Sequence, residues 1–142
     1  MKILVINGPN LNMLGLRDKG HYGSFTLNEL NEMIINKYPK INFDFYQSNY
    51  EGDIVSKLNK GFNYDAILIN AAAYTHTSVA IRDALEILTI PKASVHLSNY
   101  LNREEFRKVD YIKDVVLKVF YGKKDKSYFE AIDFLIAKVT NN

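Results

Sequence analysis

The chain contains no cysteine, which excludes disulfide bonds, thiolate metal sites and a cysteine nucleophile. It also lacks any apolar run long enough to cross a membrane. The first apolar run, at residues 3–6, is not preceded by the basic stretch and cleavage site of a signal peptide. We therefore expect a cytoplasmic protein that has no membrane partner.

An excess of charge of one sign is also absent. The 18 basic and 16 acidic residues leave a net charge of +2, and Asp125 interrupts the most basic stretch, residues 123–126. Such a balance gives no reason to expect a nucleic-acid partner. The length of 142 residues and the hydrophobic content of 47% instead predict one globular domain. We interpret residues 1–142 as a single catalytic domain.

Short apolar runs alternate with amphipathic segments along the chain. The runs predict strands at residues 3–6, 43–46, 66–69, 93–97 and 115–121. Four helices are predicted between and after them. The first has a capping box at Thr26 and Glu29, and the second has Ile54, Val55 and Leu58 on one face and Gly61 as its C-terminal cap. The third carries Val79, Leu85 and Leu88, and the last carries Ala131, Ile132, Leu135, Ile136 and Val139 on its buried face. A long polar loop separates the first strand from Thr26. This alternation indicates an α/β fold, namely a flavodoxin-like, doubly wound, five-stranded parallel sheet with strand order 2-1-3-4-5 and helices on both faces.

In such a fold, ligands bind beyond the carboxyl ends of the strands. The turns at these ends hold amides, hydroxyls, arginines and two of the three histidines: Asn7–Asn12, Arg17, Tyr22, Gln47–Asn49, Asn70, Tyr74–Ser78, His96–Asn99, Arg103 and Arg107. Neutral hydrogen-bonding groups suit a hydroxylated ligand, arginine suits a carboxylate, and histidine transfers protons near neutral pH. His21, in the long loop, is interpreted as a surface residue, so no metal cluster is expected. These residues favour acid–base chemistry on a small hydroxylated acid.

Several motifs then narrow the interpretation. They are Ile6–Gly15, Arg17 with Tyr22-Gly23, Gln47–Asn49, Tyr74–Ala80, Arg82–Ala84, His96–Asn99 and Arg103–Arg107. In this order they resemble the type II 3-dehydroquinate dehydratases, from residue 2 to about residue 112. The resemblance implies a lyase of the shikimate pathway that reversibly converts 3-dehydroquinate to 3-dehydroshikimate. It also implies an anti elimination through an enolate, no metal or cofactor, and a homo-oligomer of trimers that forms a dodecamer.

The resemblance also implies roles for individual residues. Tyr22 matches the base that removes a proton beside the ketone, and Arg17 matches the residue that stabilises its phenolate. His96 matches the general acid, Asn10 helps to hold the enolate oxygen, and Asn70 positions the departing hydroxyl.

Substrate binding involves a second set of matched residues. The backbone N–H groups of Leu97 and Ser98 match those that receive the carboxylate, and His76 and Arg107 match those that bind ring hydroxyls. Asp83 matches a residue that reaches the site from a neighbouring subunit. The other charged residues near Arg107, which are Arg103, Glu104 and Glu105, are interpreted as a solvated helical turn.

The chain departs from the family pattern in three places. Ser94 stands where a glutamate usually lies two residues before the histidine, so the usual carboxylate partner of His96 is missing. Val109-Asp110 replaces a His-Ser pair. The Gly-rich tail is mostly lost, because Leu117-Lys118 and Gly122–Lys124 occupy its place, and this change bears on the dodecamer more than on the chemistry.

Two other functions stay open from the sequence. The first is a catalytically weak relative that still binds quinate-like acids, which Ser94 and the altered tail motivate. The second is a flavodoxin-like binding module. A flavin site calls for a Ser/Thr/Gly phosphate cradle after the first strand, and a receiver module calls for acidic residues where this chain has Asn7 and Asn70. Both features are missing, so the sequence disfavours the second alternative.

Overall fold

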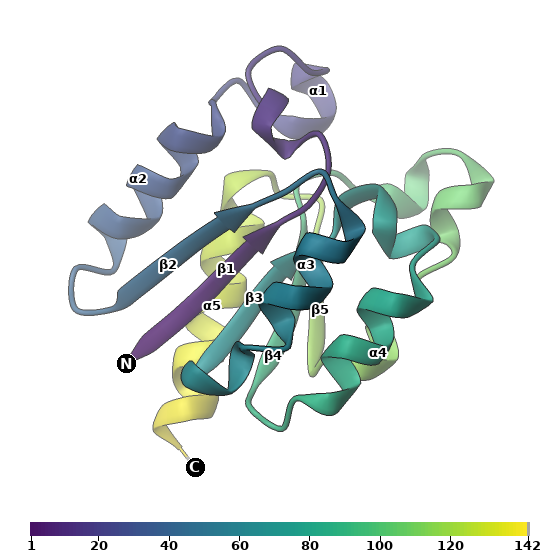
Figure 1. The fold of residues 1–142 in the computed structure, drawn as a ribbon. Helices are drawn as coiled ribbons and strands as arrows, with labels where there is room; N and C mark the ends of the chain where they lie inside the picture. Colours follow the sequence, from purple (N-terminus) through teal and green to yellow (C-terminus); the bar gives the residue numbers. More distant parts are fainter. Residues whose placement is uncertain (142) are drawn as a thin grey trace.

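The sheet consists of five strands, and every neighbouring pair is parallel (Figure 1). The computed structural model describes residues 1–141. The strands are β1 (Lys2–Asn7), β2 (Asn42–Gln47), β3 (Ala66–Asn70), β4 (Lys92–His96) and β5 (Lys118–Tyr121). Their order in the sheet is β2-β1-β3-β4-β5, which confirms the predicted doubly wound topology.

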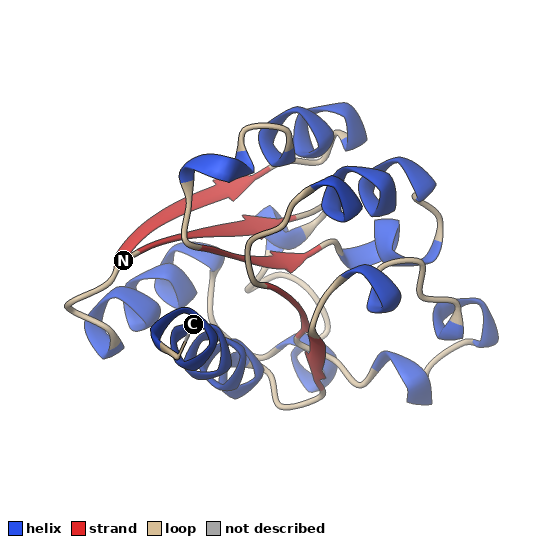
Figure 2. Ribbon diagram, turned by 90° about the horizontal axis from the view of Figure 1, so that it is seen from below, coloured by secondary structure: helices blue, strands red, loops and turns tan. Residues whose placement is uncertain are grey.

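Helices cover both faces of the sheet (Figure 2). Helices α2 (Leu27–Lys37) and α5 (Asp125–Thr140) pack on the face that carries Ile3 and Val5 of β1. Helices α3 (Glu51–Leu58) and α4 (Val79–Ile87) pack on the other face, against Leu4 and Ile6. Both faces of β1 are therefore buried, which explains why its sequence is a continuous apolar run and does not alternate.

Polar groups fix the helix ends. The predicted capping box is present, because the Thr26 hydroxyl accepts from the Glu29 N–H while the Glu29 carboxylate accepts from the Thr26 N–H. At the end of α4, the buried Lys92 ammonium donates to the carbonyls of Leu85 and Leu88, at 2.6 Å each. Burial lowers the pKa of Lys92, so these two hydrogen bonds are what keep a cation tolerable there.

The long loop after β1 contains more structure than its polar sequence suggests. It forms a 3-10 turn, η1 (Leu11–Met13), and the single helical turn α1 (Lys19–Tyr22). The Asp18 carboxylate caps α1 by accepting from the Gly20 N–H at 2.8 Å. The cap holds Tyr22, the last residue of α1, in a fixed place relative to the sheet.

Three local predictions were wrong. Strand β5 begins at Lys118, because residues 113–115 form the 3-10 turn η6 (Lys113–Val115) and Val115 and Val116 pack against the α4 face. Gly61 does not end α3; it begins the turn η2 (Gly61–Asn63), where a Cβ would lie 2.8 Å from the Ile67 side chain. Leu88 does not belong to the helix that starts at Val79; it is the C-cap residue directly after α4.

The carboxyl ends of β1, β3 and β4 lie at one edge of the sheet. Asn7 pairs in register with Asn70, and the Tyr128 hydroxyl from α5 joins the two by donating to Asn7 at 2.5 Å and accepting from Asn70 at 2.8 Å. Burial raises the pKa of Tyr128, so its hydroxyl stays protonated and able to donate. Within residues 1–141, no helix is both long and apolar enough to cross a membrane.

Candidate active site

A cavity opens at this edge of the sheet. It encloses about 460 Å³ of space when its open mouth is included. It is lined by Pro9, Asn10, Leu11, Arg17, Tyr22, Asn70, Ala72, Ala73, His76, His96, Leu97, Ser98, Tyr100, Arg103 and Arg107. The sequence-predicted site residues are thus brought together, with the single exception of Asp83.

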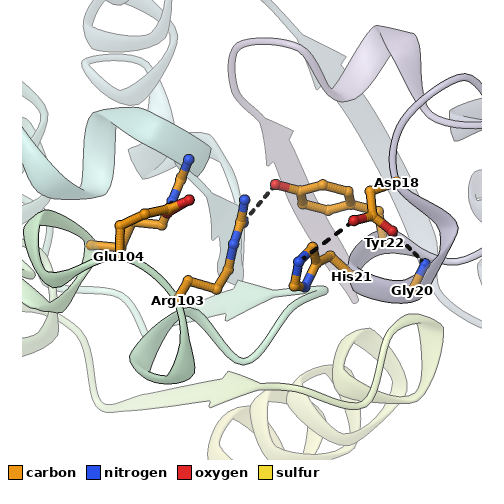
Figure 3. A network of polar contacts seen from close by, with 7 residues as sticks. Asp18, Gly20, His21, Tyr22, Arg103 and Glu104 are labelled. Carbon is orange, nitrogen blue, oxygen red and sulfur yellow. Dashed lines mark hydrogen bonds and ion pairs between the residues drawn. The ribbon is translucent and has the colours of Figure 1, made fainter.

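Tyr22 is buried at the wall of this cavity and lies between two arginines. The Arg17 guanidinium carbon is 3.7 Å from the centre of the Tyr22 ring, in a cation–π contact. Arg103 donates from Nη1 to the Tyr22 hydroxyl oxygen at 2.6 Å (Figure 3). Two cationic side chains therefore lie next to this aromatic ring and its hydroxyl.

The position of Arg103 differs from the sequence interpretation, which placed this residue in a solvated turn. Residues 100–102 form the 3-10 turn η4 (Tyr100–Asn102), and the next turn, η5, runs from Glu105 to Lys108. Arg103 lies between the two turns, where its side chain reaches across to Tyr22, 81 residues away in the chain. Its place in the Arg103–Arg107 motif was the only available signal, because nothing in the local pattern tells an inward arginine from a solvated one.

His96 ends β4 and is almost fully buried. Burial lowers the pKa of its imidazole, the carboxylate of Asp110 raises it, and the neighbouring His76 lowers it, so that the resulting pKa is about 4. The Tyr100 ring packs against it with ring centres 4.3 Å apart. His96 is therefore neutral at pH 7.

The two asparagines of the site are held by backbone and side-chain partners. The Asn70 side-chain oxygen accepts from the Ala72 N–H at 3.0 Å, while its amide donates to Tyr128. Asn10 adopts a left-handed backbone with φ of 68°, and its N–H donates to the Asn49 side chain at 3.0 Å. Asparagine tolerates this conformation better than most residues. These contacts fix the Asn70 side chain and the Asn10 backbone at the cavity wall.

The remaining predicted residues divide into two groups. The His76 Nδ1–H donates to the Val109 carbonyl at 2.7 Å, which leaves Nε2 free to accept, and Arg107 pairs with Glu104 beside the cavity. Asp83 lies exposed on α4, outside the cavity of its own chain. Among the residues that the structure describes, no three His, Asp or Glu side chains are grouped closely enough to hold a metal ion.

Comparison with known proteins agrees with this geometry. Residues 1–136 match the family described as "Dehydroquinase class II". The chain belongs to the class II dehydroquinases. The resemblance drawn from the motifs is thereby confirmed, and it extends through β5 and most of α5.

Individual class II dehydroquinases share nearly the whole chain. The 3-dehydroquinate dehydratase of Acaryochloris marina is 47% identical over 94% of this chain and 92% of its own length. That of Fusobacterium nucleatum is 46% identical over 96% of this chain and 97% of its own length. The crystal structure of the type II dehydroquinase from Butyrivibrio crossotus superimposes with a TM-score of 0.92 at 46% identity, covering 95% of this chain and 97% of that one.

The depressed pKa of His96 generates a prediction about stability. A histidine titrates near pH 6.5 in an unfolded chain and at about 4 in this fold, so the unfolded state binds more protons between these values. Stability contributed by neutral His96 is therefore present above pH 6.5 and is lost as the pH falls toward 4, at up to about 1.4 kcal/mol per pH unit. In urea unfolding, the free energy of unfolding of His96→Asn should fall less steeply with decreasing pH than that of the parent chain.

His21→Asn is the matched control, because His21 is exposed. It should leave the acid loss unchanged. An equal slope in His96→Asn and the parent would mean that His96 does not resist protonation in the folded state.

Proposed function

We propose that the cavity is the active site of a 3-dehydroquinate dehydratase, a lyase that removes water from 3-dehydroquinate to give 3-dehydroshikimate. The observation that carries this proposal is the arrangement around Tyr22 and His96. A tyrosine held between two arginines and a buried histidine line the same cavity, so a base and an acid act on one bound molecule. Membership of the class II dehydroquinases supports the same reaction.

Tyr22 acts as the base. Its phenolate removes the proton from the carbon beside the ketone, and the electron pair of that C–H bond moves onto the ketone oxygen as an enolate. The Arg103 hydrogen bond and the Arg17 cation stabilise the phenolate before the transfer. Asn10, fixed at the cavity wall, contributes to holding the enolate oxygen, in the manner of an oxyanion-hole element.

His96 acts as the acid. Collapse of the enolate expels the hydroxyl group, which takes the proton of the His96 imidazolium and leaves as water. Because neutral His96 predominates in the empty cavity at pH 7, the carboxylate of the substrate supplies the negative charge that raises its proton affinity. To restore the starting state, Tyr22 releases to solvent the proton that it gained, and His96 takes up a proton from solvent.

The other wall residues bind the substrate. The backbone N–H groups of Leu97 and Ser98, directly after His96, receive the carboxylate close to the imidazole that it activates. Asn70 positions the departing hydroxyl, and His76 and Arg107 bind the ring hydroxyls. All of them line the cavity, and their contacts with neighbouring backbone or side chains orient them before a ligand arrives.

We also propose that the chain assembles into trimers, with a dodecamer as the larger form. Asp83 is the supporting residue, because it lies exposed on α4 and outside its own cavity. Val79 and Ile87 of the same helix are 51% and 63% exposed. Apolar side chains gathered on one helix suit a surface that another subunit covers, and such a neighbour brings its Asp83 to this cavity.

The reaction itself gives the first prediction. Protein treated with EDTA should convert 3-dehydroquinate to a product that absorbs in the ultraviolet as a conjugated enone. A rise in absorbance at an enzymatic rate would establish the lyase and its independence of divalent metal. Protection against heat by the substrate, without any rise, would instead identify a weak relative that binds quinate-like acids.

The base and its arginine give the second prediction. Tyr22→Phe should abolish turnover, because the ring then has no atom that can accept the proton. Arg103→Ala should lower kcat about tenfold to a hundredfold, as expected for loss of one charged hydrogen bond. Steady-state kinetics over a range of pH would measure both effects.

Matched controls separate chemistry from packing. Tyr50→Phe removes a hydroxyl from an exposed ring, and Lys108→Ala removes an exposed cation beside η5. Both controls should keep the parent rate. Full activity in Tyr22→Phe would show that a different group takes the proton.

The assembly gives the third prediction. Tyr22→Phe and Asp83→Asn should each be inactive alone, yet chains mixed by unfolding and refolding together should regain activity. After random assembly of equal amounts into trimers with each site shared by two neighbours, about a quarter of all sites combine an intact Tyr22 with an intact Asp83. Light scattering would confirm the mass of the assembly. No recovery in trimers that mix the two variants would place the function of Asp83 within its own subunit.

A further inference from the structure

His96 has no acidic neighbour on its own strand. Ser94, two residues earlier on β4, points to the same face of the sheet and is fully buried. Within residues 1–141, neither the Ser94 hydroxyl nor the His96 Nε2 has a hydrogen-bond partner. A buried histidine that must carry a positive charge during turnover therefore receives no help from the strand that positions it.

A carboxylate does reach this region from another part of the chain. Asp110 lies in the segment between η5 and η6, which crosses the α4 side of the sheet and buries Ile112 there. One oxygen of Asp110 accepts from the N–H groups of Ile112 and Lys113, at 2.9 and 3.0 Å. The other oxygen accepts from the Tyr100 hydroxyl at 2.9 Å.

Tyr100 connects this carboxylate with the histidine. Its ring lies against the His96 imidazole, with ring centres 4.3 Å apart, while its hydroxyl reaches Asp110. The Tyr121 ring meets Tyr100 edge to face at 5.5 Å and so restricts its movement. Burial and the Asp110 carboxylate raise the pKa of Tyr100, so the ring bears no charge of its own that could replace that of Asp110.

The segment that carries Asp110 is itself fixed to its surroundings. His76 donates to the Val109 carbonyl, the Tyr111 N–H donates to the Thr75 carbonyl at 3.0 Å, and Arg82 donates to the Tyr111 carbonyl at 2.8 Å. The carboxylate is therefore held at a set place relative to β4, and its field at His96 does not depend on a mobile side chain.

Other charged and titratable groups surround His96. His76, from the turn after β3, opposes protonation of His96, and Asp110 favours it. Tyr100 is neutral because its pKa is raised. The arginines that line the cavity, Arg17, Arg103 and Arg107, are cations that cannot favour an imidazolium. Asp110 is thus the negatively charged group that opposes the effect of burial on the pKa of His96.

We propose that Asp110, connected through Tyr100, is the positioning residue that stabilises the protonated form of His96 during dehydration. The proposal rests on the proposed function, in which His96 is the acid. Asp110 touches neither the cavity nor the substrate in this role; it acts through Tyr100 and through its charge. It takes the place of a carboxylate at position 94, so the negative charge reaches His96 from a loop and not from its own strand.

Asp110→Asn tests the proposal with little change of shape. The amide oxygen still accepts from the backbone N–H groups of residues 112 and 113, and the amide nitrogen can donate to the Tyr100 hydroxyl, while the charge is lost. Two measurements follow the proton on His96. They are the alkaline limb of the kcat profile, and nuclear magnetic resonance titration of isotope-labelled histidine in the full-length protein saturated with quinate. Quinate has the carboxylate and hydroxyls of the substrate but no ketone, so it does not react.

Asp110→Asn should move both transitions to lower pH by about one unit. Tyr100→Phe keeps the ring against His96 but breaks the hydrogen bond to Asp110, and it should move them in the same direction by a smaller amount. Asp114→Asn removes an equal charge from the exposed side of η6 and should move neither. If Asp110→Asn does not fold, Tyr100→Phe alone carries the test.

Transitions that stay at the parent pH in the variants would overturn the proposal and leave Asp110 as a turn residue. The titration with quinate needs binding but no turnover. A chain that binds quinate without dehydrating 3-dehydroquinate would therefore contradict the proposed function, while the Asp110 comparison still gives its own answer.

Discussion

Parallel pairing of the five strands is the constraint on which the site depends. Because all strands run in the same direction, their carboxyl ends lie along one edge, and Asn7, Asn70 and His96 are delivered to the same region. Tyr128 then fixes the distance between the first two by hydrogen bonding to both. Asn70 and His96 are oriented by the rigid sheet, whereas Tyr22, the arginines and the other residues of the cavity come from the turns and loops beyond it.

Opposed charges organise the cavity around this frame. Arg17 is partly buried; burial lowers its pKa, Tyr22 raises it, and the nearby Arg103 and Arg107 lower it. In the proposed mechanism the phenolate of Tyr22, the enolate and a ligand carboxylate are all anions, so this group of cations favours the charged species of the reaction. Near His96, the negative charge of Asp110 offsets the positive charge of these arginines.

The sequence predicted the fold well because its signals are local. Strand and helix periodicities, the capping box at Thr26 and the order of the turns each involve neighbours in the chain. Pairing between distant side chains has no such signal. Arg103 and Tyr22 are 81 residues apart, and Asp110 reaches Tyr100 only because the segment after η5 folds back over the sheet. The sequence could therefore mark Asp110 as unusual without indicating what it contacts.

The hydrogen bonds of Tyr128 also set the order in which the protein can be completed during synthesis. Tyr128 lies 121 positions after Asn7 in the chain, so this contact can form only long after β1 has been synthesised. Strands β1 and β3 can pair earlier. Asn7 and Asn70 at their ends, however, are not joined through the Tyr128 hydroxyl until α5 has been synthesised and packs on the sheet. Until α5 packs on the sheet, Asn70 therefore lacks one of the two side-chain contacts that orient it at the cavity.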